Sequence, residues 1–232
     1  MPERCLLCYI TDRTAFAADE PTRRRRLLEK IAEAARAGVD YIQLREKDLT
    51  TRELELLARE AMTLIGEAAR LTTVHRPVTT ALLINSRTDI ALAVGADGIH
   101  LRSDDVSPQN VRDIWEKYGA GAPAREIRPR NPLIGVSCHA PEEVLGAKSD
   151  AATFAVFAPV FAKRVSPTTQ PAGLTQLRKA CKADIPVLAL GGIALENAKS
   201  CLEAGAAGIA AIRLFQENDI AAVVESLHQL CR

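Results

Sequence analysis

The sequence alternates eight times between a short apolar segment and a longer amphipathic one. The short segments have the length and composition of buried strands, and the longer ones carry apolar residues at helical spacing. A helical segment follows each strand, from residues 22–37 after the first to residues 220–230 after the last. The predicted strands cover residues 6–10, 41–44, 81–85, 98–101, 133–137, 153–157, 186–190 and 208–212.

Eight consecutive strand-then-helix units, with no change of composition along the chain, favour a closed barrel over a doubly wound sheet. The chain has 232 residues, a common length for an α/β barrel although long for one ordinary domain. We therefore expect residues 1–232 to form a single (β/α)8 TIM-barrel domain. Functional residues of such a barrel lie at the C-terminal ends of the strands and in the loops that follow.

The charge balance limits the possible partners. The chain has 30 Lys and Arg residues against 29 Asp and Glu residues, a formal net charge of +1. Such a protein lacks the basic field that draws proteins to nucleic acid or anionic membranes, so we expect neither partner. No apolar run approaches the roughly 20 residues that span a bilayer, and the first residues lack the pattern of a secretion signal. A cytoplasmic enzyme is therefore expected.

The six cysteines are scattered along the chain, unlike the dense framework of a small secreted protein, so reduced thiols are expected. Cys5 and Cys8 form a C-x-x-C motif, a pattern found in metal and redox sites. They lie in "CLLCYI", an extended segment that runs into the first predicted strand and in which residues three apart point to opposite faces. No second C-x-x-C or nearby histidine adds ligands. We expect no metal or redox role for this pair.

Charged and polar residues follow the predicted strands directly. The second strand leads into four consecutive charges, residues 45–48, which we expect to rim the mouth of the barrel. Cations outnumber carboxylates over all strand ends, which favours an anionic small molecule as the ligand. The strand-end residues are Gln43, Arg45, Lys47, Asn85, Ser86, Arg87, His100, Arg102, Asp104, Asp105, Ser137, His139, Lys163, Arg164, Ser166, Gly191, Gly192 and Arg213.

Gly191 and Gly192 follow the seventh strand, and a helix is predicted soon after them. A pair of glycines is usually only a turn. In TIM barrels, however, the loops after strands 7 and 8 frequently bind phosphate, and a backbone without side chains can approach the anion closely. The position of the pair therefore favours a phosphate site.

Two further strand ends have more than one interpretation. Asp104 and Asp105 could hold Mg²⁺, which takes one or two carboxylates and completes its shell with water and phosphate oxygens, or they could cap the next helix. His139 could transfer protons near neutral pH, or it could be a packing residue. The sequence leaves these alternatives open.

These motifs resemble the thiamine-phosphate synthase and TenI family. The resemblance runs from about Cys8 to Phe215 through "QLREKD", "NSRTDIALAVGADGIHL", "GVSCHAPEE", "APVF", "PVLALGGIALENA" and "GAAGIAAI". It implies a (β/α)8 barrel that forms a homo-oligomer, usually a dimer, and handles small phosphorylated and pyrophosphorylated substrates of thiamine biosynthesis. The synthases join hydroxymethylpyrimidine pyrophosphate to thiazole phosphate with Mg²⁺ as cofactor and release pyrophosphate.

The resemblance also implies roles for individual residues. It places Gln43, Arg45, Lys47 and Asn85 on the pyrimidine pyrophosphate, and Asp105 on Mg²⁺. Departure of pyrophosphate leaves a cationic pyrimidine methylene group, so basic side chains and Mg²⁺ must stabilise the leaving charge. The predicted catalytic residues are Lys47, Ser137 and His139, the predicted metal ligand is Asp105, and the predicted substrate-binding residues are Gln43, Arg45, Lys47, Asn85, Arg87, Ser137, Gly191, Gly192 and Arg213.

This sequence departs from the synthase pattern at three places. Ser86 stands where synthases usually have a second metal-binding aspartate. Ser166, in "AKRVS", stands at the usual position of a lysine after strand 6, which Lys163 or Arg164 could replace. The segment "HLRSDD" replaces the more usual "HLGQxD".

These departures leave two alternatives to a synthase. A TenI-like thiazole tautomerase would not need the metal and would use His139 as its general acid and base. A non-catalytic binder would hold thiazole phosphate without turning it over. Because Lys47 and Asp105 are present, and one carboxylate with pyrophosphate can still hold Mg²⁺, the sequence favours the synthase.

Overall fold

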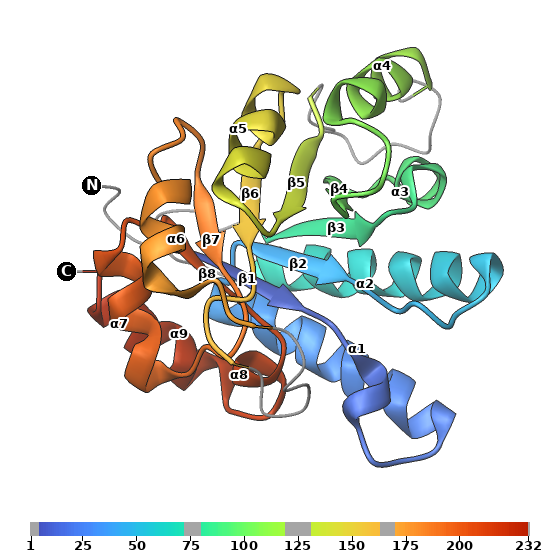
Figure 1. Cartoon of the computed structure of the whole chain (residues 1–232). Helices are drawn as coiled ribbons and strands as arrows, with labels where there is room; N and C mark the ends of the chain where they lie inside the picture. Colours follow the sequence, from blue (N-terminus) through green and yellow to red (C-terminus); the bar gives the residue numbers. More distant parts are fainter. Residues whose placement is uncertain (1–4, 72–79, 119–130, 163–169, 232) are drawn as a thin grey trace.

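Eight parallel strands close into a barrel in sequence order, and β8 pairs with β1 (Figure 1). The computed structural model describes residues 5–71, 80–118, 131–162 and 170–231. The predicted (β/α)8 TIM barrel is confirmed. The strands are β1 (Leu6–Ile10), β2 (Tyr41–Leu44), β3 (Ala81–Asn85), β4 (Gly98–Leu101), β5 (Leu133–Cys138), β6 (Phe154–Phe157), β7 (Val187–Ala189) and β8 (Gly208–Ala211).

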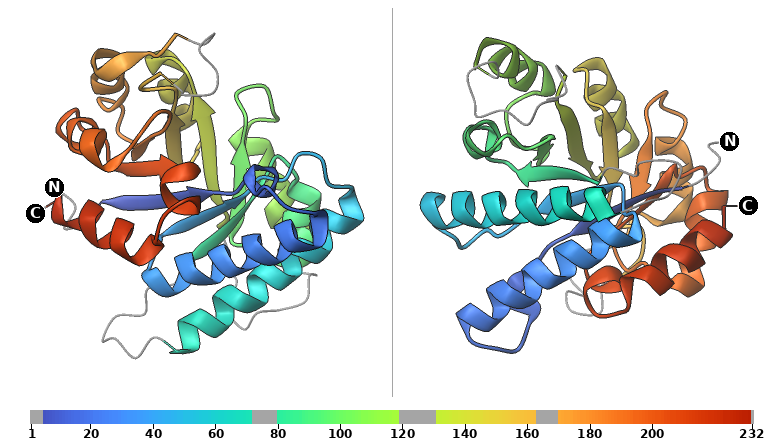
Figure 2. Two further views of the ribbon diagram at one scale, coloured as in Figure 1. Left: turned by 90° about the horizontal axis from the view of Figure 1, so that it is seen from below. Right: turned by 180° about the vertical axis from the view of Figure 1, so that it is seen from behind.

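Helices connect the strands and cover the outside of the barrel, with α1 and α2 side by side (Figure 2). The sequence does not predict α8, because four residues are too few to display helical periodicity. No helix in the described part of the chain is both long and apolar enough to cross a membrane. The helices are η1 (Arg13–Ala15), α1 (Glu20–Ala37), α2 (Thr51–Leu71), α3 (Thr88–Val94), α4 (Pro108–Tyr118), α5 (Pro141–Ser149), α6 (Gly173–Ala180), α7 (Leu195–Glu203), α8 (Arg213–Gln216) and α9 (Ile220–Gln229).

Local signals explain where the two longest helices begin and end. The Asp19 side chain accepts a hydrogen bond from the Thr22 amide at the start of α1, and Gly38 ends this helix with a left-handed φ of 81°. Before α2, the Glu53 carboxylate accepts from the Thr50 amide, while the Thr50 hydroxyl accepts from the Glu53 amide. This reciprocal capping box satisfies amide groups that have no partner inside the helix.

Strand alternation divides the core into an inner and an outer cluster. The inner cluster fills the barrel and includes Cys8, Leu83 and Phe154, whereas the outer cluster lies between strands and helices and includes Cys5. The Tyr41 ring stacks on Phe154 inside the barrel, with 4.8 Å between the ring centroids. Cys5 and Cys8 therefore point to opposite faces, as predicted, and both are free thiols.

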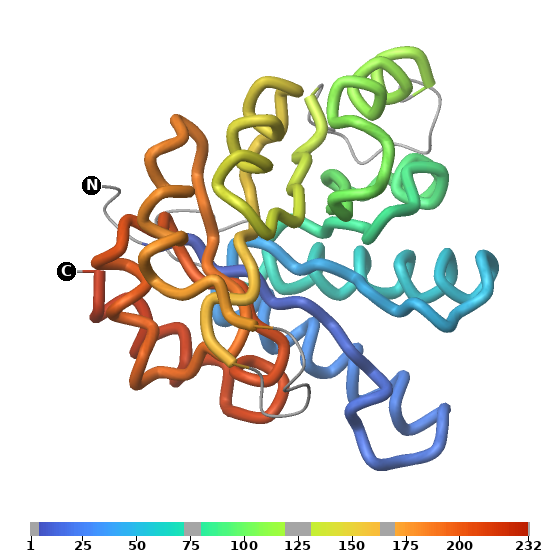
Figure 3. The backbone as a smooth tube through the Cα atoms, viewed as in Figure 1, coloured from blue at the N-terminus to red at the C-terminus, as the bar shows by residue number. Residues whose placement is uncertain are grey.

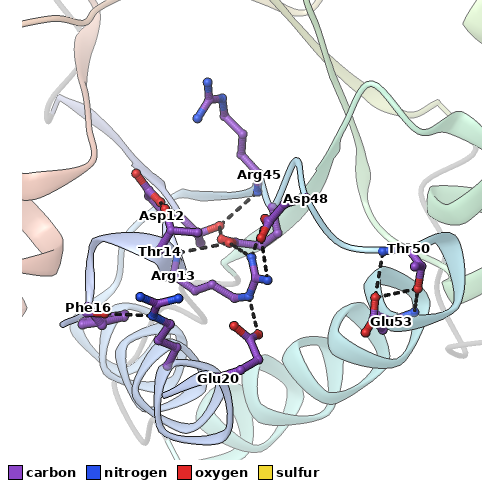
Figure 4. Close-up of polar contacts among 12 residues, drawn as sticks. Asp12, Arg13, Thr14, Phe16, Glu20, Arg45, Asp48, Thr50 and Glu53 are labelled. Atoms are coloured by element: carbon purple, nitrogen blue, oxygen red, sulfur yellow. Dashed lines mark hydrogen bonds and ion pairs between the residues drawn. The ribbon is translucent and has the colours of Figure 1, made fainter. Parts of the chain in front are cut away.

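An ion cluster with a buried centre joins the loops after β1 and β2 (Figure 4). Arg13 donates from Nη1 to Glu46 Oε2 at 3.2 Å and to Asp48 Oδ1 at 2.6 Å, and from Nε to Glu20 Oε1 at 2.6 Å. The Thr11 hydroxyl donates to Glu46 Oε1 at 2.6 Å. The Arg13 and Glu46 side chains are only 4% and 1% exposed, so neither charge is solvated by water. The cluster thereby fixes the first two loops to each other.

The first and last strands pair to close the barrel, whose backbone is traced in Figure 3, and this joint requires a glycine. A Cβ atom on Gly208 would lie 1.9 Å from the Leu6 carbonyl oxygen. Both residues are on paired strands, Leu6 opposite Gly208, so neither backbone can move away without breaking the ladder that closes the barrel. Glycine is needed here for close approach of two backbones.

We expect Gly208→Ala to destabilise the fold by about 3 kcal/mol or more, because the added methyl group meets backbone atoms that cannot relax. Gly146→Ala is the matched control. Gly146 lies in α5 with nothing within 4 Å of an added Cβ, so its replacement should stabilise the protein by up to about 1 kcal/mol. Urea unfolding followed by circular dichroism measures both changes, and equal effects would contradict the packing argument.

Arg13→Met should cost about 3 to 5 kcal/mol of unfolding free energy, because it leaves the Glu46 carboxylate buried without its cation. Arg25→Met provides the comparison, since Arg25 pairs with Glu29 on the exposed surface of α1 and should cost less than about 1 kcal/mol. The same unfolding experiment applies. If Arg13→Met cost no more than Arg25→Met, the cluster would be no stronger than a surface ion pair.

Candidate active site

Polar side chains replace apolar ones at the C-terminal ends of β2 and β3, inside the barrel. Tyr41 and Leu83 contact the inner cluster, so Gln43 and Asn85, two residues further along their strands, share its face. Gln43 Nε2 donates to Asn85 Oδ1 at 2.8 Å. Gln43 Oε1 is buried and has no hydrogen-bond partner in the described part of the chain, so it is an acceptor available to a donor group of a ligand.

The hydrogen-bonded chain continues from β3 to the loop after β4. Asn85 Nδ2 donates to Ser86 Oγ at 3.1 Å, and Ser86 Oγ donates to Asp105 Oδ2 at 2.6 Å. Ser86 has a left-handed φ of 59°, an uncommon conformation for a residue other than glycine. The structure therefore brings Gln43, Asn85 and Asp105 together, three residues that the sequence assigned to one site.

Arg102 neutralises Asp105. The Arg102 amide donates to Asp105 Oδ2 at 2.8 Å, and its guanidinium donates to Oδ1 from Nε at 3.3 Å and from Nη2 at 3.1 Å. Burial opposes ionisation of Asp105, but the hydrogen bonds from Ser86 and Arg102 keep its pKa below the usual range. Asp105 is thus an ionised carboxylate with an arginine as its counter-ion.

The capping alternative for Asp104 and Asp105 is not supported. The amide of Asn110, at the start of α4, donates to Ser107 Oγ at 3.2 Å, so Ser107 caps this helix. Asp104 lies outside the hydrogen-bonded chain with its side chain 70% exposed, and its Oδ1 is 3.4 Å from Arg102 Nε.

A cavity of about 290 Å³ adjoins this hydrogen-bonded chain. Lys47, Arg87 and Arg102 bring three cationic side chains to its wall, and Asn85 and Ser86 bring polar ones. Arg87 is also held by Asp89, at 2.6 Å between Nη2 and Oδ2. Leucine side chains and Glu46 complete the lining. Cations outnumber carboxylates in this cavity, as expected for a site that binds an anion.

The four charges after β2 do not all face the mouth, which corrects the prediction for residues 45–48. Glu46 and Asp48 both bind Arg13, although Glu46 also borders the cavity that Lys47 lines. The Arg45 side chain extends away from the ion cluster (Figure 4). Its charge lies close enough to the buried His100 to help lower that residue's pKa. The sequence did not indicate this division, because the partner Arg13 lies in a different loop.

His100 and Ser137 form a second polar pair inside the barrel. His100 Nε2 and Ser137 Oγ are 2.9 Å apart, and the His100 ring lies against Phe154, with 6.2 Å between centroids. Burial, with the nearby charge of Arg45, lowers the pKa of His100 to about 4, so the ring is neutral at physiological pH. Ser137 is therefore held by an uncharged partner.

His139 lies on the exposed side of the β5 to α5 connection. Its Nδ1 is 2.7 Å from the Ala158 carbonyl oxygen, and its amide donates to Glu143 Oε2 at 2.7 Å. A carbonyl oxygen only accepts hydrogen bonds, so Nδ1 is the donor, and in the neutral form of the ring Nε2 carries the lone pair. Within the described segments, the hydrogen bonds of His139 go to Ala158 and Glu143 and not to the chain that ends at Asp105.

The loop after β7 needs its glycines for structural reasons. Gly191 and Gly192 have positive φ angles of 100° and 64°. A Cβ atom on Gly192 would lie 2.6 Å from the Ala162 carbonyl oxygen, and one on Gly191 would lie 2.8 Å from Pro159. Substitution of Gly192 would therefore disturb the loop after β6 whether or not a phosphate binds there.

Of the remaining predicted residues, the structure describes only Arg213. Arg213 opens α8, with its Nε 3.7 Å from Glu217 Oε1 and its side chain 47% exposed. Lys163, Arg164 and Ser166 lie outside the described residues.

Known proteins with similar sequences support one family. The profile of the family described as thiamine monophosphate synthase (TMP-TENI) matches residues 7–215. A putative thiamine-phosphate synthase 2 of Aquifex aeolicus is 37% identical over 212 residues, which cover 91% of this chain and 97% of that protein. A thiamine-phosphate synthase of Syntrophomonas wolfei is 34% identical over 229 residues, covering 97% of this chain and 95% of the other.

The fold is similar to that of a solved member of the same group. The structure of thiamine phosphate pyrophosphorylase from Pyrococcus furiosus superposes with a TM-score of 0.74 at 28% identity, and the match covers 98% of this chain and 95% of the other. The profile match and the relatives agree with the motifs quoted above. The chain belongs to the thiamine monophosphate synthase family.

Proposed function

We propose that this protein is a thiamine-phosphate synthase, which joins hydroxymethylpyrimidine pyrophosphate to thiazole phosphate and releases pyrophosphate. The names of its relatives support this activity. The observation that carries the proposal at the level of the site is the cationic cavity beside Asn85 and Ser86, at the C-terminal ends of β2 to β4. A pyrophosphate group requires such concentrated positive charge.

In this proposal the cavity would bind the pyrophosphate end of the pyrimidine substrate. Lys47, Arg87 and Arg102 would stabilise the negative charge that grows as the carbon–oxygen bond to pyrophosphate breaks. Gln43 Oε1, an open acceptor inside the barrel, would take a hydrogen bond from the pyrimidine. The thiazole nitrogen would then attack the cationic methylene carbon, so one carbon–oxygen bond is exchanged for one carbon–nitrogen bond.

His100 and Ser137 would act on the pyrimidine ring from the opposite side. Because His100 is neutral and buried, it would hold the Ser137 hydroxyl in place without adding charge next to the cationic methylene group. A second cation at this point would raise the energy of the intermediate. Ser137 would contact the ring, and His100 would act as a positioning residue.

Mg²⁺ is part of the proposal, and the oxygen donors near Asp105 fit it. Mg²⁺ prefers oxygen ligands, and Asp105 and Ser86 bring a carboxylate and a hydroxyl within 2.6 Å of each other. The described residues contain no group of three His, Cys, Asp or Glu side chains that could hold a metal ion. Mg²⁺ would therefore need oxygens of the pyrophosphate as well, and it would supply further positive charge to the leaving group.

A thiazole tautomerase is the second candidate, and His139 is the observation that favours it. With Nδ1 engaged by the Ala158 carbonyl, Nε2 is available as a base. A general base at this position would move a proton on thiazole phosphate without the help of a metal ion. Relatives named thiamine-phosphate synthase favour the first candidate.

We further propose a cytoplasmic homodimer that binds its thiazole phosphate at Gly191, Gly192 and Arg213. Free thiols at all six cysteines agree with a reducing compartment. The dimer is inferred from the family, whose members usually associate.

Lys47→Ala tests the cavity as the pyrophosphate site. We expect kcat/KM for the pyrimidine substrate to fall by roughly 10- to 100-fold, because a charge that stabilises the leaving group is lost, while the melting temperature changes little. Lys199→Ala, which removes an exposed lysine of α7, should change neither. Steady-state kinetics and thermal melts of both variants provide the measurement. A large melting shift with unaltered kinetics would contradict the assignment.

A second experiment separates synthase from tautomerase. For a synthase, EDTA should abolish thiamine phosphate formation and the isosteric Asp105→Asn should reduce kcat by about 100-fold or more, whereas His139→Ala should have little effect. A tautomerase should give the reverse, with His139→Ala costing about 100-fold or more. Product formation from both thiamine precursors, with thiazole isomerisation followed in parallel, distinguishes them. Synthase activity that persists undiminished in EDTA would end the proposal for Mg²⁺.

A further inference from the structure

The carboxylate proposed to hold Mg²⁺ is already saturated by donors from its own chain. Asp105 Oδ2 accepts from Ser86 Oγ and from the Arg102 amide, and Oδ1 accepts twice from the Arg102 guanidinium. An ionised carboxylate has about four lone-pair positions, and all four are used. The guanidinium also places a positive charge beside the oxygen that a metal ion would approach. Mg²⁺ therefore cannot reach Asp105 Oδ1 while Arg102 stays in this position.

Arg102 is the weakly held member of this pair. Its guanidinium lies 3.1 and 3.3 Å from Oδ1, longer than the 2.7 to 2.9 Å that is usual for a charge-assisted hydrogen bond. The Arg102 side chain is 53% exposed, whereas that of Asp105 is 13% exposed. By contrast, Ser86 holds the other oxygen at 2.6 Å. Asp105 is fixed, and the guanidinium can leave it at little cost.

Arg102 also lies where an incoming anion would meet it. Its side chain lines the cavity together with Lys47 and Arg87. A diphosphate offers a guanidinium several charged oxygens, which compete directly with one carboxylate. The same residue can therefore pair with Asp105 in the free protein and with phosphate oxygens in the complex.

We propose that Arg102 is an exchangeable counter-ion that makes Mg²⁺ binding depend on the diphosphate. In the free protein it covers Asp105 and excludes the metal ion. When a diphosphate enters the cavity, the guanidinium transfers to it and Asp105 Oδ1 becomes a ligand for Mg²⁺. This inference rests on the proposed function and adds the order in which charges are exchanged within its site.

Because residue 86 is a serine, Arg102 alone can serve as the counter-ion of Asp105. With a neutral hydroxyl at residue 86, Arg102 offsets the charge of Asp105, while the nearby Asp104 is 70% exposed and its charge is screened by water. A second carboxylate at this position would leave a net negative charge, which favours a resident cation. The serine and the arginine thus act together.

The test measures two affinities in the free protein, with Mg²⁺ alone and inorganic pyrophosphate in EDTA as the probes in isothermal titration calorimetry. For Arg102→Ala we expect Mg²⁺ affinity to rise about tenfold or more and pyrophosphate affinity to fall by a similar factor, the usual range for coupled sites. A misfolded variant would lose both affinities, so changes of opposite sign report the exchange itself.

Arg87→Ala is the matched control. It also removes a cation from the cavity wall, but its ionic partner is Asp89 and not Asp105. It should weaken pyrophosphate binding without raising the affinity for Mg²⁺.

Two results would overturn the inference. One is a free wild-type protein that binds Mg²⁺ as tightly without pyrophosphate as with it, and the other is an Arg102→Ala variant with unchanged Mg²⁺ affinity. If the wild type still forms thiamine phosphate in either case, only the role of Arg102 is lost. If the wild type binds no pyrophosphate and forms no product, the proposed function falls as well.

Discussion

The buried pair of Arg13 and Glu46 determines how the site is assembled. Burial raises the pKa of Glu46, and the hydrogen bonds from Thr11 and Arg13 oppose this by favouring the charged form. Two charges removed from water must remain together, so the loops after β1 and β2 cannot move independently. β2 ends at Leu44 and residues 47–48 lie in a turn, so contacts and not strand alternation set the directions of these side chains. With Glu46 and Asp48 directed at Arg13, Arg45 and Lys47 are directed elsewhere, toward the barrel interior and the cavity.

The interior of the barrel is polar on one side of its mouth and apolar on the other. β2 to β5 supply Gln43, Asn85, His100 and Ser137, whereas the inner residues of β6 to β8 include Val156, Leu188 and Ala210. In the proposed reaction, pyrophosphate would depart beside the cations of the cavity, and Gln43 and Ser137 on the polar side would hold the pyrimidine ring. Residues from different strands can contribute to one site because every second residue of each strand faces the barrel interior.

Charge balance around Asp105 distinguishes this chain from the usual pattern of its family. By the resemblance given in the sequence analysis, Ser86 stands where a metal-binding aspartate is expected and Arg102 lies in a segment that departs from the usual "HLGQxD". The structure shows that both substitutions act on the same carboxylate, since Ser86 and Arg102 hydrogen bond to different oxygens of Asp105. The two residues therefore act on one carboxylate.

The sequence by itself determined the barrel, because the repeated order of strands and helices and the apolar periodicity are local properties that only a few topologies accommodate. It also identified most of the cavity, since strand ends of a closed parallel barrel must meet on one face. The ion cluster of Arg13, the pairing of His100 with Ser137 and the covering of Asp105 by Arg102 were decided only by the tertiary structure. Which charged groups pair depends on the distances between side chains and on their burial. Arg13 and Glu46, for example, are 33 residues apart in the sequence, and no local pattern connects them.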